Sequence, residues 1–246
     1  AWLLSIIIFR CPSINLLIIL LRRLSLVLYG VDMAIIGYGL GGRGLILEEI
    51  CRVLKRTGAI EFGTFKLPNG RITPYYIDLR VITSFPDAFA KVVDIFVDSI
   101  RSEIGVENFD RIAGIPTAGL PLSSVSAYLL KKPFIYIRQK QRLRGRERRV
   151  EGIIVPGDRV LLVDDLVTTG LTLKKSALAV RAEGGLVSDA IVLLDREEGG
   201  RERLEKIGVK LHSVLKISNV AQKLYEMDAI GEDEVKIMLS QVKSRV

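Results

Sequence analysis

The sequence predicts an α/β fold built on a doubly wound, mainly parallel sheet, and three observations lead to that prediction. Short apolar runs alternate with segments of helical periodicity between residues 86 and 216. The run at 160–163 is apolar throughout, as expected of a parallel strand buried on both faces. Polar clusters follow four of the predicted strands, at residues 116–119, 138, 164–172 and 195–198. Because ligands bind at the carboxyl ends of such strands, we expect these clusters to share one site.

Length and composition limit the domain organisation. At 246 residues, one domain of about 200 residues with an appendage is the natural expectation. Two cysteines form neither a disulfide framework nor a metal cluster, which fits a reducing compartment, and His212 is predicted to be a strand residue.

The net charge is +8, but seven basic residues against one acid fall within 138–149. This segment is therefore predicted to face a strong anion.

Residues 1–32 are apolar but interrupted by Arg10 and by Arg22–Arg23, and no uncharged run reaches the ~18–20 residues that span a bilayer. They could be a peripheral membrane anchor, a packing or oligomerisation arm, or an extension translated from a start upstream of Met33. We favour the third interpretation. The following motif at 39–44 matches G-x-G-x-x-G, but no strand–helix–strand unit surrounds it. We predict a flexible joint there, and hence an extension with its joint over 1–44.

The predicted elements from residue 45 onward begin with a small α+β hood. Helical spacing of apolar residues predicts a helix from Leu45 that ends at Gly58. Alternation over 59–80 around Pro68-Asn69-Gly70 predicts a hairpin, and Pro74 limits its second strand to an edge position. Residues 86–101 are amphipathic and predict a helix.

The remaining elements are predicted to build the sheet. Strands are expected at 111–115, 133–138, 160–163, 189–195 and 210–215, with helices at 116–130, 171–183 and 200–207. The main domain is thus predicted over 45–218. Residues 219–246 are predicted to be a tail of two short helices, joined near Gly231, that packs on the domain.

The segment 160–172, VLLVDDLVTTGLT, has the pattern of a phosphate site. Thr168-Thr169-Gly170 form a predicted turn after the strand, and Thr172 opens a helix whose N-terminal amides and dipole attract an anion. Asp164 and Asp165 suit the vicinal hydroxyls of a ribose, with a divalent cation near a diphosphate. The alternative is an ordinary loop start with a helix cap.

This segment resembles the signature of type I phosphoribosyltransferases, which bind 5-phosphoribosyl 1-diphosphate (PRPP). Five strings follow one another in the order found in orotate phosphoribosyltransferases: FGTFKLPNGRITPYYIDLR, PTAGLPL, IRQKQRLRGRERRVEG, VDDLVTTG and LLDREEGG. The resemblance covers nearly all of 45–200. It implies attack by N1 of orotate on the anomeric carbon of PRPP, giving orotidine 5′-monophosphate and diphosphate in pyrimidine synthesis.

The resemblance also assigns residues. It implies a PRPP site formed by Arg138, Thr117, Ala118, Gly119, Asp164, Asp165, Val167, Thr168, Thr169, Gly170 and Thr172. It implies an orotate site formed by Arg196, Thr168 and Tyr76, and catalytic roles for Arg142, Arg144, Asp164 and Asp165. Mg²⁺ is expected to be held mainly by PRPP and water, with no dedicated protein ligands. The resemblance further implies a cytoplasmic homodimer that shares the basic segment 138–149 between subunits, without nucleic-acid or membrane partners.

The basic segment departs from the family pattern R-K-x-x-K-x-H-G. Gln139, Arg142 and Arg144 replace the first lysine, the second lysine and the histidine. Arginine keeps its charge but does not give up a proton, so a general-acid contribution worth about 10²-fold would be absent. The alternatives are therefore a PRPP-binding regulator with little turnover that contacts nucleic acid, and a transferase for another base, which Arg196 argues against.

Overall fold

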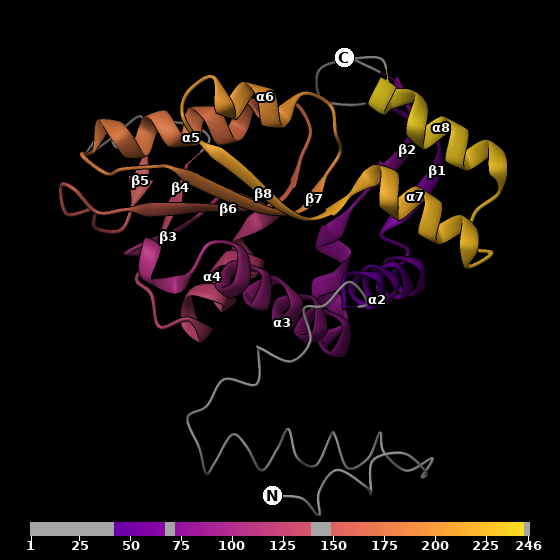
Figure 1. Ribbon diagram of the computed structural model, residues 1–246, viewed down its shortest axis with the longest axis horizontal. Helices are drawn as coiled ribbons and strands as arrows, with labels where there is room; N and C mark the ends of the chain where they lie inside the picture. The colour runs from indigo at the N-terminus through magenta and orange to yellow at the C-terminus, as the bar shows by residue number, and fades with distance from the viewer. Residues whose placement is uncertain (1–41, 67–71, 139–148, 244–246) are drawn as a thin grey trace, which may run out of the picture. The chain divides into compact units, whose positions relative to one another are not determined.

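The computed structural model describes residues 42–66, 72–138 and 149–243, shown in colour in Figure 1. The chain divides into two units after Gly41, and all described residues belong to the second. Its centre is a six-stranded sheet in the order β5–β4–β3–β6–β7–β8. The strands are β3 (Arg111–Gly114), β4 (Phe134–Ile137), β5 (Val150–Glu151), β6 (Val160–Val167), β7 (Asp189–Asp195) and β8 (Lys210–Lys216). All pair in parallel except β5, which is antiparallel to β4. The predicted doubly wound sheet is confirmed.

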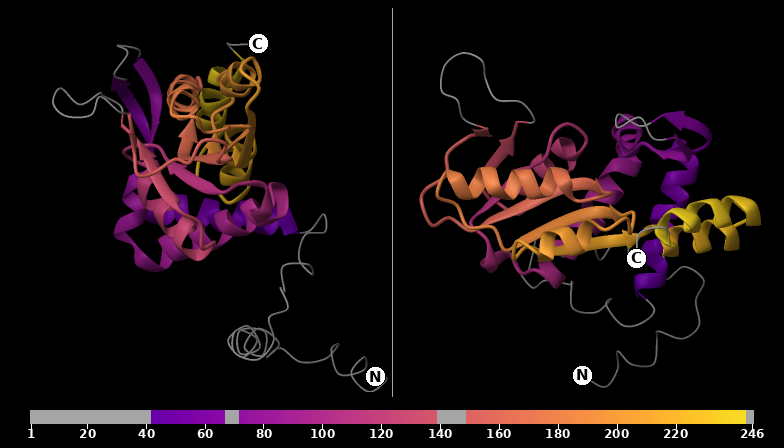
Figure 2. Two further views of the ribbon diagram at one scale, coloured as in Figure 1. Left: turned by 90° about the vertical axis from the view of Figure 1, so that its left-hand side faces the viewer. Right: turned by 90° about the horizontal axis from the view of Figure 1, so that it is seen from above.

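Helices cover both faces of the sheet (Figures 1 and 2). One face carries α3 (Pro86–Glu103) and α4 (Gly119–Leu129), and the other carries α5 (Leu171–Ala182) and α6 (Gly200–Glu205). Alternate residues of β6 enter two separate cores: Leu161 and Val163 pack on one face, Val160 and Leu162 on the other. A strand with two buried faces needs apolar residues at every position, which is why 160–163 is an unbroken apolar run.

The N-terminal hood is present. It consists of α2 (Gly42–Thr57) and the antiparallel strands β1 (Ile60–Lys66) and β2 (Ile72–Ile77), followed by a 3₁₀ turn, η2 (Leu79–Ser84). Pro74 lies in β2, where a two-stranded sheet has only edge strands and tolerates a missing N–H. The predicted turn at 68–70 and the glycines at 39 and 41 lie outside the described residues. The rest of that predicted joint, 42–44, forms the first turn of α2 instead.

The C-terminal tail packs against the hood as well as the sheet. It consists of α7 (Ile217–Glu226) and α8 (Glu232–Lys243), drawn in yellow beside the violet hood in Figure 1. Val220 and Met238 of the tail belong to the same apolar core as Ile50 and Leu54 of α2. Elements from the two ends of the described unit therefore meet, and α8 contacts β2 directly. The predicted boundaries at residues 44 and 218 stay predictions.

Two details of the sheet differ from the sequence-based expectation. β6 does not end at Val163 but continues to Val167, since its backbone pairs with β7 up to Asp195. Polar side chains at 164 and 165 change the chemistry of the strand without interrupting its hydrogen-bonded ladder. The short strand β5 was not predicted. It pairs with β4 through only two residue pairs, too few for a sequence pattern. None of the helices in 42–243 that the structure describes has the length and apolarity of a membrane span.

Candidate active site

The candidate site lies where the strand order reverses. The chain runs outward from β3 to β4 and then returns to β6 on the other side of β3, so the carboxyl ends of β3 and β6 lie side by side. Such a reversal leaves a crevice between the connections, and ligands of doubly wound sheets bind there. Residues 116–119 follow β3 and residues 168–172 follow β6. The structure therefore brings two of the predicted polar clusters to one place.

The turn after β6, residues 168–172, leads into the N-terminus of α5, as an anion site needs, and we call it the phosphate turn. Gly170 caps α5 with φ of 70°, which allows Thr168 and Thr169 to turn directly into the helix. A cavity of about 60 Å³ is lined by Asp164 and residues 166–173, with Thr172 exposed at the first turn of α5. Because the first amides of a helix lack intrahelical partners, this cavity faces unpaired N–H donors and the positive end of the helix dipole. It suits a phosphate.

Gly170 also has no room for a side chain. A Cβ at this position would lie 2.8 Å from the carbonyl oxygen and 3.0 Å from the Cα of Gly200, at the start of α6. The phosphate turn is thus packed directly against the next connection of the sheet. Val167, which was predicted to contact PRPP, lines the cavity, but its side chain is buried in the core.

The aspartate pair lies in the second half of β6, where Asp164 is buried and Asp165 is half-buried. The Asp165 amide donates to Asp164 Oδ1 at 3.0 Å. Burial raises the pKa of Asp164 well above its usual range, and the adjacent Asp165 carboxylate raises it further. Burial also raises the pKa of Asp165, while the charge of Arg80 acts in the opposite direction. Two carboxylates that are costly to ionise side by side favour a partner that brings hydroxyls or positive charge.

The turn after β3 approaches this pair closely. Gly119 begins α4, and a Cβ there would lie 2.6 Å from Asp164 Oδ1. Thr117 is exposed, Ala118 is half-buried, and the peptide between Pro116 and Thr117 is cis. The predicted diphosphate turn and the predicted ribose aspartates are therefore in contact through Gly119.

The first and last residues of the basic segment, Arg138 and Arg149, are joined beside the edge strand β5. The Arg138 amide donates to the Arg149 carbonyl at 2.7 Å, next to the β4–β5 pairing. The Arg138 guanidinium pairs with Glu151 at 3.1 Å. With Arg149, Lys175 and Thr172, Arg138 lines a second cavity of about 230 Å³. Thr172 lines both cavities, so Arg138 lies beside the phosphate turn. Arg142 and Arg144 lie outside the described residues.

Arg196 is bound to the phosphate turn through its backbone. Its amide donates to the Val167 carbonyl at 2.9 Å, and its side chain is only 5% exposed. The guanidinium carbon lies 4.8 Å from the centre of the Tyr75 ring, and Nε lies 3.1 Å from Glu198 Oε1. Its Nη2 donates to Gln241 at 3.3 Å. The arginine predicted to bind orotate is therefore held by the hood, the sheet and the tail together.

Tyr76, the tyrosine predicted to contact orotate, does not face Arg196. Neighbouring residues of a strand point to opposite sides, and Tyr76 packs against Phe65 with ring centroids 5.6 Å apart. Its hydroxyl accepts a hydrogen bond from Arg80 at 3.2 Å. Arg80 is held in turn by both oxygens of Asp78, at 2.7 Å each, and its charge acts on Asp165. Tyr76 therefore contacts Arg80, on the opposite side of β2 from the Tyr75 ring that lies against Arg196.

Sequence reasoning missed four residues near the predicted ones: Tyr75, Arg80, Lys175 and Gln241. Tyr75 and Arg80 stand in the string PYYIDLR, so the strand period of two could have separated the two tyrosines. Lys175 lies one turn after Thr172 on α5 and could have been found by helical spacing. Gln241 lies in a tail with no polar motif, and no signal in the sequence pointed to it.

The sequence predicted His212 to be a strand residue and the two cysteines to form no disulfide framework. His212 is buried in β8 and lies 2.8 Å from Asp189, as a strand residue. Cys51 is a buried free thiol, and burial raises its pKa to about 12. Within the described ranges, no group of three histidines, cysteines or carboxylates could hold a metal ion.

Comparison with known proteins agrees with this geometry. Residues 81–228 match the phosphoribosyl transferase domain family. The orotate phosphoribosyltransferase of Saccharolobus solfataricus is 41% identical over 198 residues, which are 80% of this chain and 98% of the relative. The crystal structure of orotate phosphoribosyltransferase from Aeropyrum pernix superposes with a TM-score of 0.63 at 34% identity, covering 72% of this chain and 99% of that one.

A larger enzyme contains the same fold. The UMP synthase of Leishmania donovani superposes with a TM-score of 0.71 at 30% identity, and the match covers 79% of this chain. It covers 42% of the UMP synthase, so this chain corresponds to one part of that protein. These relatives favour the transferase over the PRPP-binding regulator. With 41% identity across nearly the whole length of a curated relative, the chain belongs to the orotate phosphoribosyltransferase family.

Proposed function

We propose that this chain transfers the 5-phosphoribosyl group of PRPP to N1 of orotate, releasing diphosphate and forming orotidine 5′-monophosphate. One observation carries the proposal: the Arg196 amide is hydrogen-bonded to the Val167 carbonyl, immediately before the phosphate turn. This hydrogen bond supports the proposal because it fixes the backbone of Arg196, whose guanidinium suits a carboxylate, beside the turn proposed to bind phosphate. A sugar phosphate and a carboxylated base would be held side by side, as the reaction requires.

The residues divide the work by charge. The turn formed by Thr168, Thr169, Gly170 and Thr172 binds the 5′-phosphate through amides and hydroxyls. Asp164 and Asp165 accept hydrogen bonds from the ribose hydroxyls and orient the anomeric carbon toward the base. Thr117, Ala118 and Gly119 offer backbone donors to the diphosphate. Arg196 holds the orotate carboxylate, and Thr168 lies near the base.

Departure of diphosphate builds negative charge on the leaving group, so catalysis consists mainly of stabilising that charge and excluding water. Arg138, Arg142 and Arg144 supply fixed positive charge on the basic segment. As arginines, they bind the departing oxygens without donating a proton. The segment 138–149 would be shared between the subunits of a homodimer, so each site would be completed by its neighbour.

Mg²⁺ is the expected cofactor. The two aspartates provide hard oxygen ligands, but too few to hold the ion alone. Mg²⁺ would therefore be held largely by PRPP oxygens and water. When bound, it neutralises part of the diphosphate charge. We further propose that the protein works in the cytoplasm in the synthesis of uridine 5′-monophosphate, without nucleic-acid or membrane partners.

A spectrophotometric assay tests the proposal. Protein incubated with PRPP, Mg²⁺ and orotate should consume the orotate absorbance, and diphosphate should appear in equal amount. Arg196→Ala should raise the KM for orotate by about 10²-fold, because it removes a charged, desolvated pair, and leave the KM for PRPP nearly unchanged. Arg101→Ala is the matched control, since Arg101 is an exposed arginine of α3 that pairs only locally with Asp98. PRPP binding without orotate turnover would contradict the proposal.

A further inference from the structure

The C-terminal helix reaches the buried arginine through a chain of hydrogen bonds. Arg196 Nη2 donates to Gln241 Oε1 at 3.3 Å, and Gln241 Nε2 donates to Thr73 Oγ1 at 3.3 Å. The Thr73 hydroxyl donates in turn to the Tyr75 carbonyl at 2.9 Å. Tyr75 carries the ring that stacks on Arg196. The side-chain amide of Gln241 in α8 therefore connects Arg196 to β2, the strand that carries Tyr75.

We propose that Gln241 is a positioning residue for Arg196, and that the C-terminal helix thereby sets the preference of the site for a carboxylated pyrimidine. The inference rests on the proposed function, because Arg196 is taken to bind the orotate carboxylate. Gln241 itself is not taken to touch the substrate. It acts by fixing the guanidinium plane.

A fixed guanidinium plane matters because a carboxylate is bound through two parallel N–H groups. An arginine side chain has many rotamers, and holding it in one of them before the ligand arrives lowers the cost of binding. Tyr75 fixes the plane from its face, and Glu198 holds Nε. Gln241 holds Nη2 at the other end. A guanidinium has five N–H donors, so these contacts leave donors for an incoming carboxylate.

The chemistry of the amide also fits this role. Glu198 already places one carboxylate 3.1 Å from Arg196 in a buried setting. A second carboxylate at position 241 would hold Nη2 as well, but it would repel the negative charge of the ligand. The glutamine supplies an acceptor oxygen without that charge, and its NH₂ group reaches Thr73 at the same time.

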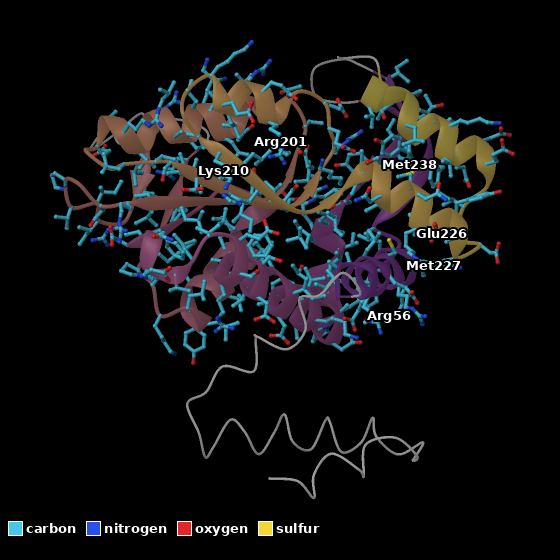
Figure 3. The ribbon with its side chains drawn as sticks, in the orientation of Figure 1. Arg56, Arg201, Lys210, Glu226, Met227 and Met238 are labelled. Carbon is cyan, nitrogen blue, oxygen red and sulfur yellow. The ribbon has the colours of Figure 1, made fainter. Side chains whose placement is uncertain are left out.

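Packing of the tail does not require this amide. The apolar contacts of α7 and α8 with the main core include those of the fully buried Val220, Leu224 and Met238, the last of which is labelled in Figure 3. Gln241 is only partly buried, near the end of α8. A substitution that preserves its size should therefore leave the tail in place and affect mainly Arg196.

The test compares two glutamines of the tail. Gln241→Leu removes both hydrogen bonds at nearly constant volume, and Gln222→Leu is the control, since Gln222 is exposed on α7 and bonds only Glu226. For Gln241→Leu, the KM for orotate should rise about tenfold, as expected for losing a hydrogen bond to a charged group, while the KM for PRPP stays within about twofold. Gln241→Glu should weaken orotate at least as much, because of charge repulsion.

Product binding gives a readout that a purely structural role would not change. Orotidine 5′-monophosphate and uridine 5′-monophosphate differ by the carboxylate alone, and their Kd values are measured by calorimetry. Gln241→Leu should lower the preference for the carboxylated nucleotide about tenfold, and should have no further effect in the Arg196→Ala background.

Each contrary outcome has a defined meaning. If the wild-type protein turns over orotate but Gln241→Leu changes neither the orotate KM nor the nucleotide preference, the positioning role is wrong and the proposed function stands. An equal rise in the KM for orotate and in the KM for PRPP, together with a lowered Tm, would also contradict the positioning role. It would indicate that Gln241 supports the packing of the tail instead. If the wild type shows no orotate turnover, the proposed function itself fails.

Discussion

The two ends of the proposed site, one for the phosphate and one for the base, are built in different ways. The phosphate end is one continuous segment, in which residues 164–173 run from a strand through a turn into a helix. The base end is assembled from β2, the connection after β7, and α8, with Arg196 in contact with Tyr75 and Gln241. The phosphate end thus depends on local backbone geometry, and the base end depends on how hood and tail pack.

This difference separates what is shared from what can vary. Any phosphoribosyl donor presents the same 5′-phosphate, so a rigid local turn is sufficient to bind it. The base differs from one transferase to another, and side chains from several elements can be exchanged without disturbing the sheet. We therefore expect substitutions at the phosphate end to affect PRPP, and substitutions at the base end to affect orotate.

The largest effect is expected at Asp164, at the start of the phosphate end. Asp164→Asn should lower kcat/KM by about 10²-fold, because a ribose hydroxyl loses its charged acceptor in a buried site. The same variant should be more stable than the wild type. Since burial raises the folded-state pKa of Asp164 above its ordinary 3.8, ionisation opposes folding above that pH, and asparagine removes this cost.

Thermal melts check the sign. The gain in Tm of Asp164→Asn should be larger at pH 8 than at pH 5, since the wild-type penalty grows as pH rises from 3.8 toward the raised pKa. Asp98→Asn, at a half-buried position of α3 where the side chain pairs with Arg101, is the control and should change neither activity nor Tm. A destabilised Asp164→Asn would show that the aspartate is needed for the fold.

The next effect isolates the phosphate turn. Gly170→Ala adds a Cβ that would lie 2.8 Å from the Gly200 carbonyl, so the turn must shift and the KM for PRPP should rise about tenfold. The KM for orotate at saturating PRPP should change far less. Gly58→Ala has a similar φ of 66° but open space around the new Cβ, and so controls for backbone strain alone. Steady-state kinetics on both variants decides the matter.

A smaller effect is expected at the base end. Tyr75→Leu removes the ring beside Arg196 and should raise the KM for orotate about fivefold, which corresponds to about 1 kcal/mol for the lost cation–π contact. Tyr75→Phe should behave like the wild type. Tyr76→Leu should affect orotate less than Tyr75→Leu, because Tyr76 faces Arg80 on the other side of the strand. If Tyr76→Leu raised the KM for orotate more than Tyr75→Leu, Tyr76 would have the base-binding role that the sequence suggested.

The smallest effect concerns residues 1–32. A chain that starts at Met33 should keep kcat and both KM values within about twofold, because every residue to which we assign a role in the site follows position 72 in the sequence. The measurement is a side-by-side kinetic comparison with the full chain. Loss of activity in the shorter chain would contradict the prediction that this segment is a translated extension.

The same contrast explains what could be predicted from the sequence. The sheet, its helices and the phosphate turn follow from contiguous patterns, such as the apolar run at 160–163 and the turn at 168–170. Arg196 was identified by resemblance to a family string. Gln241 was not predicted, because it is 45 positions from Arg196 and 168 from Thr73, and only tertiary packing brings the three together. The end of β6 was misplaced because a backbone ladder does not depend on side-chain polarity.

The hydrogen bond from Arg138 to Arg149 has a consequence for how the enzyme can evolve. It joins the Arg138 amide nitrogen to the Arg149 carbonyl oxygen at 2.7 Å, across an interval of ten residues. Because the entropy of closing a loop grows only slowly with length, insertions and exchanges in that interval cost the fold little, about 0.6 kcal/mol for each doubling. Turnover rate and thermal stability can therefore be selected separately in this protein, and we expect the departures from the family pattern at Gln139, Arg142 and Arg144 to be changes of the first kind.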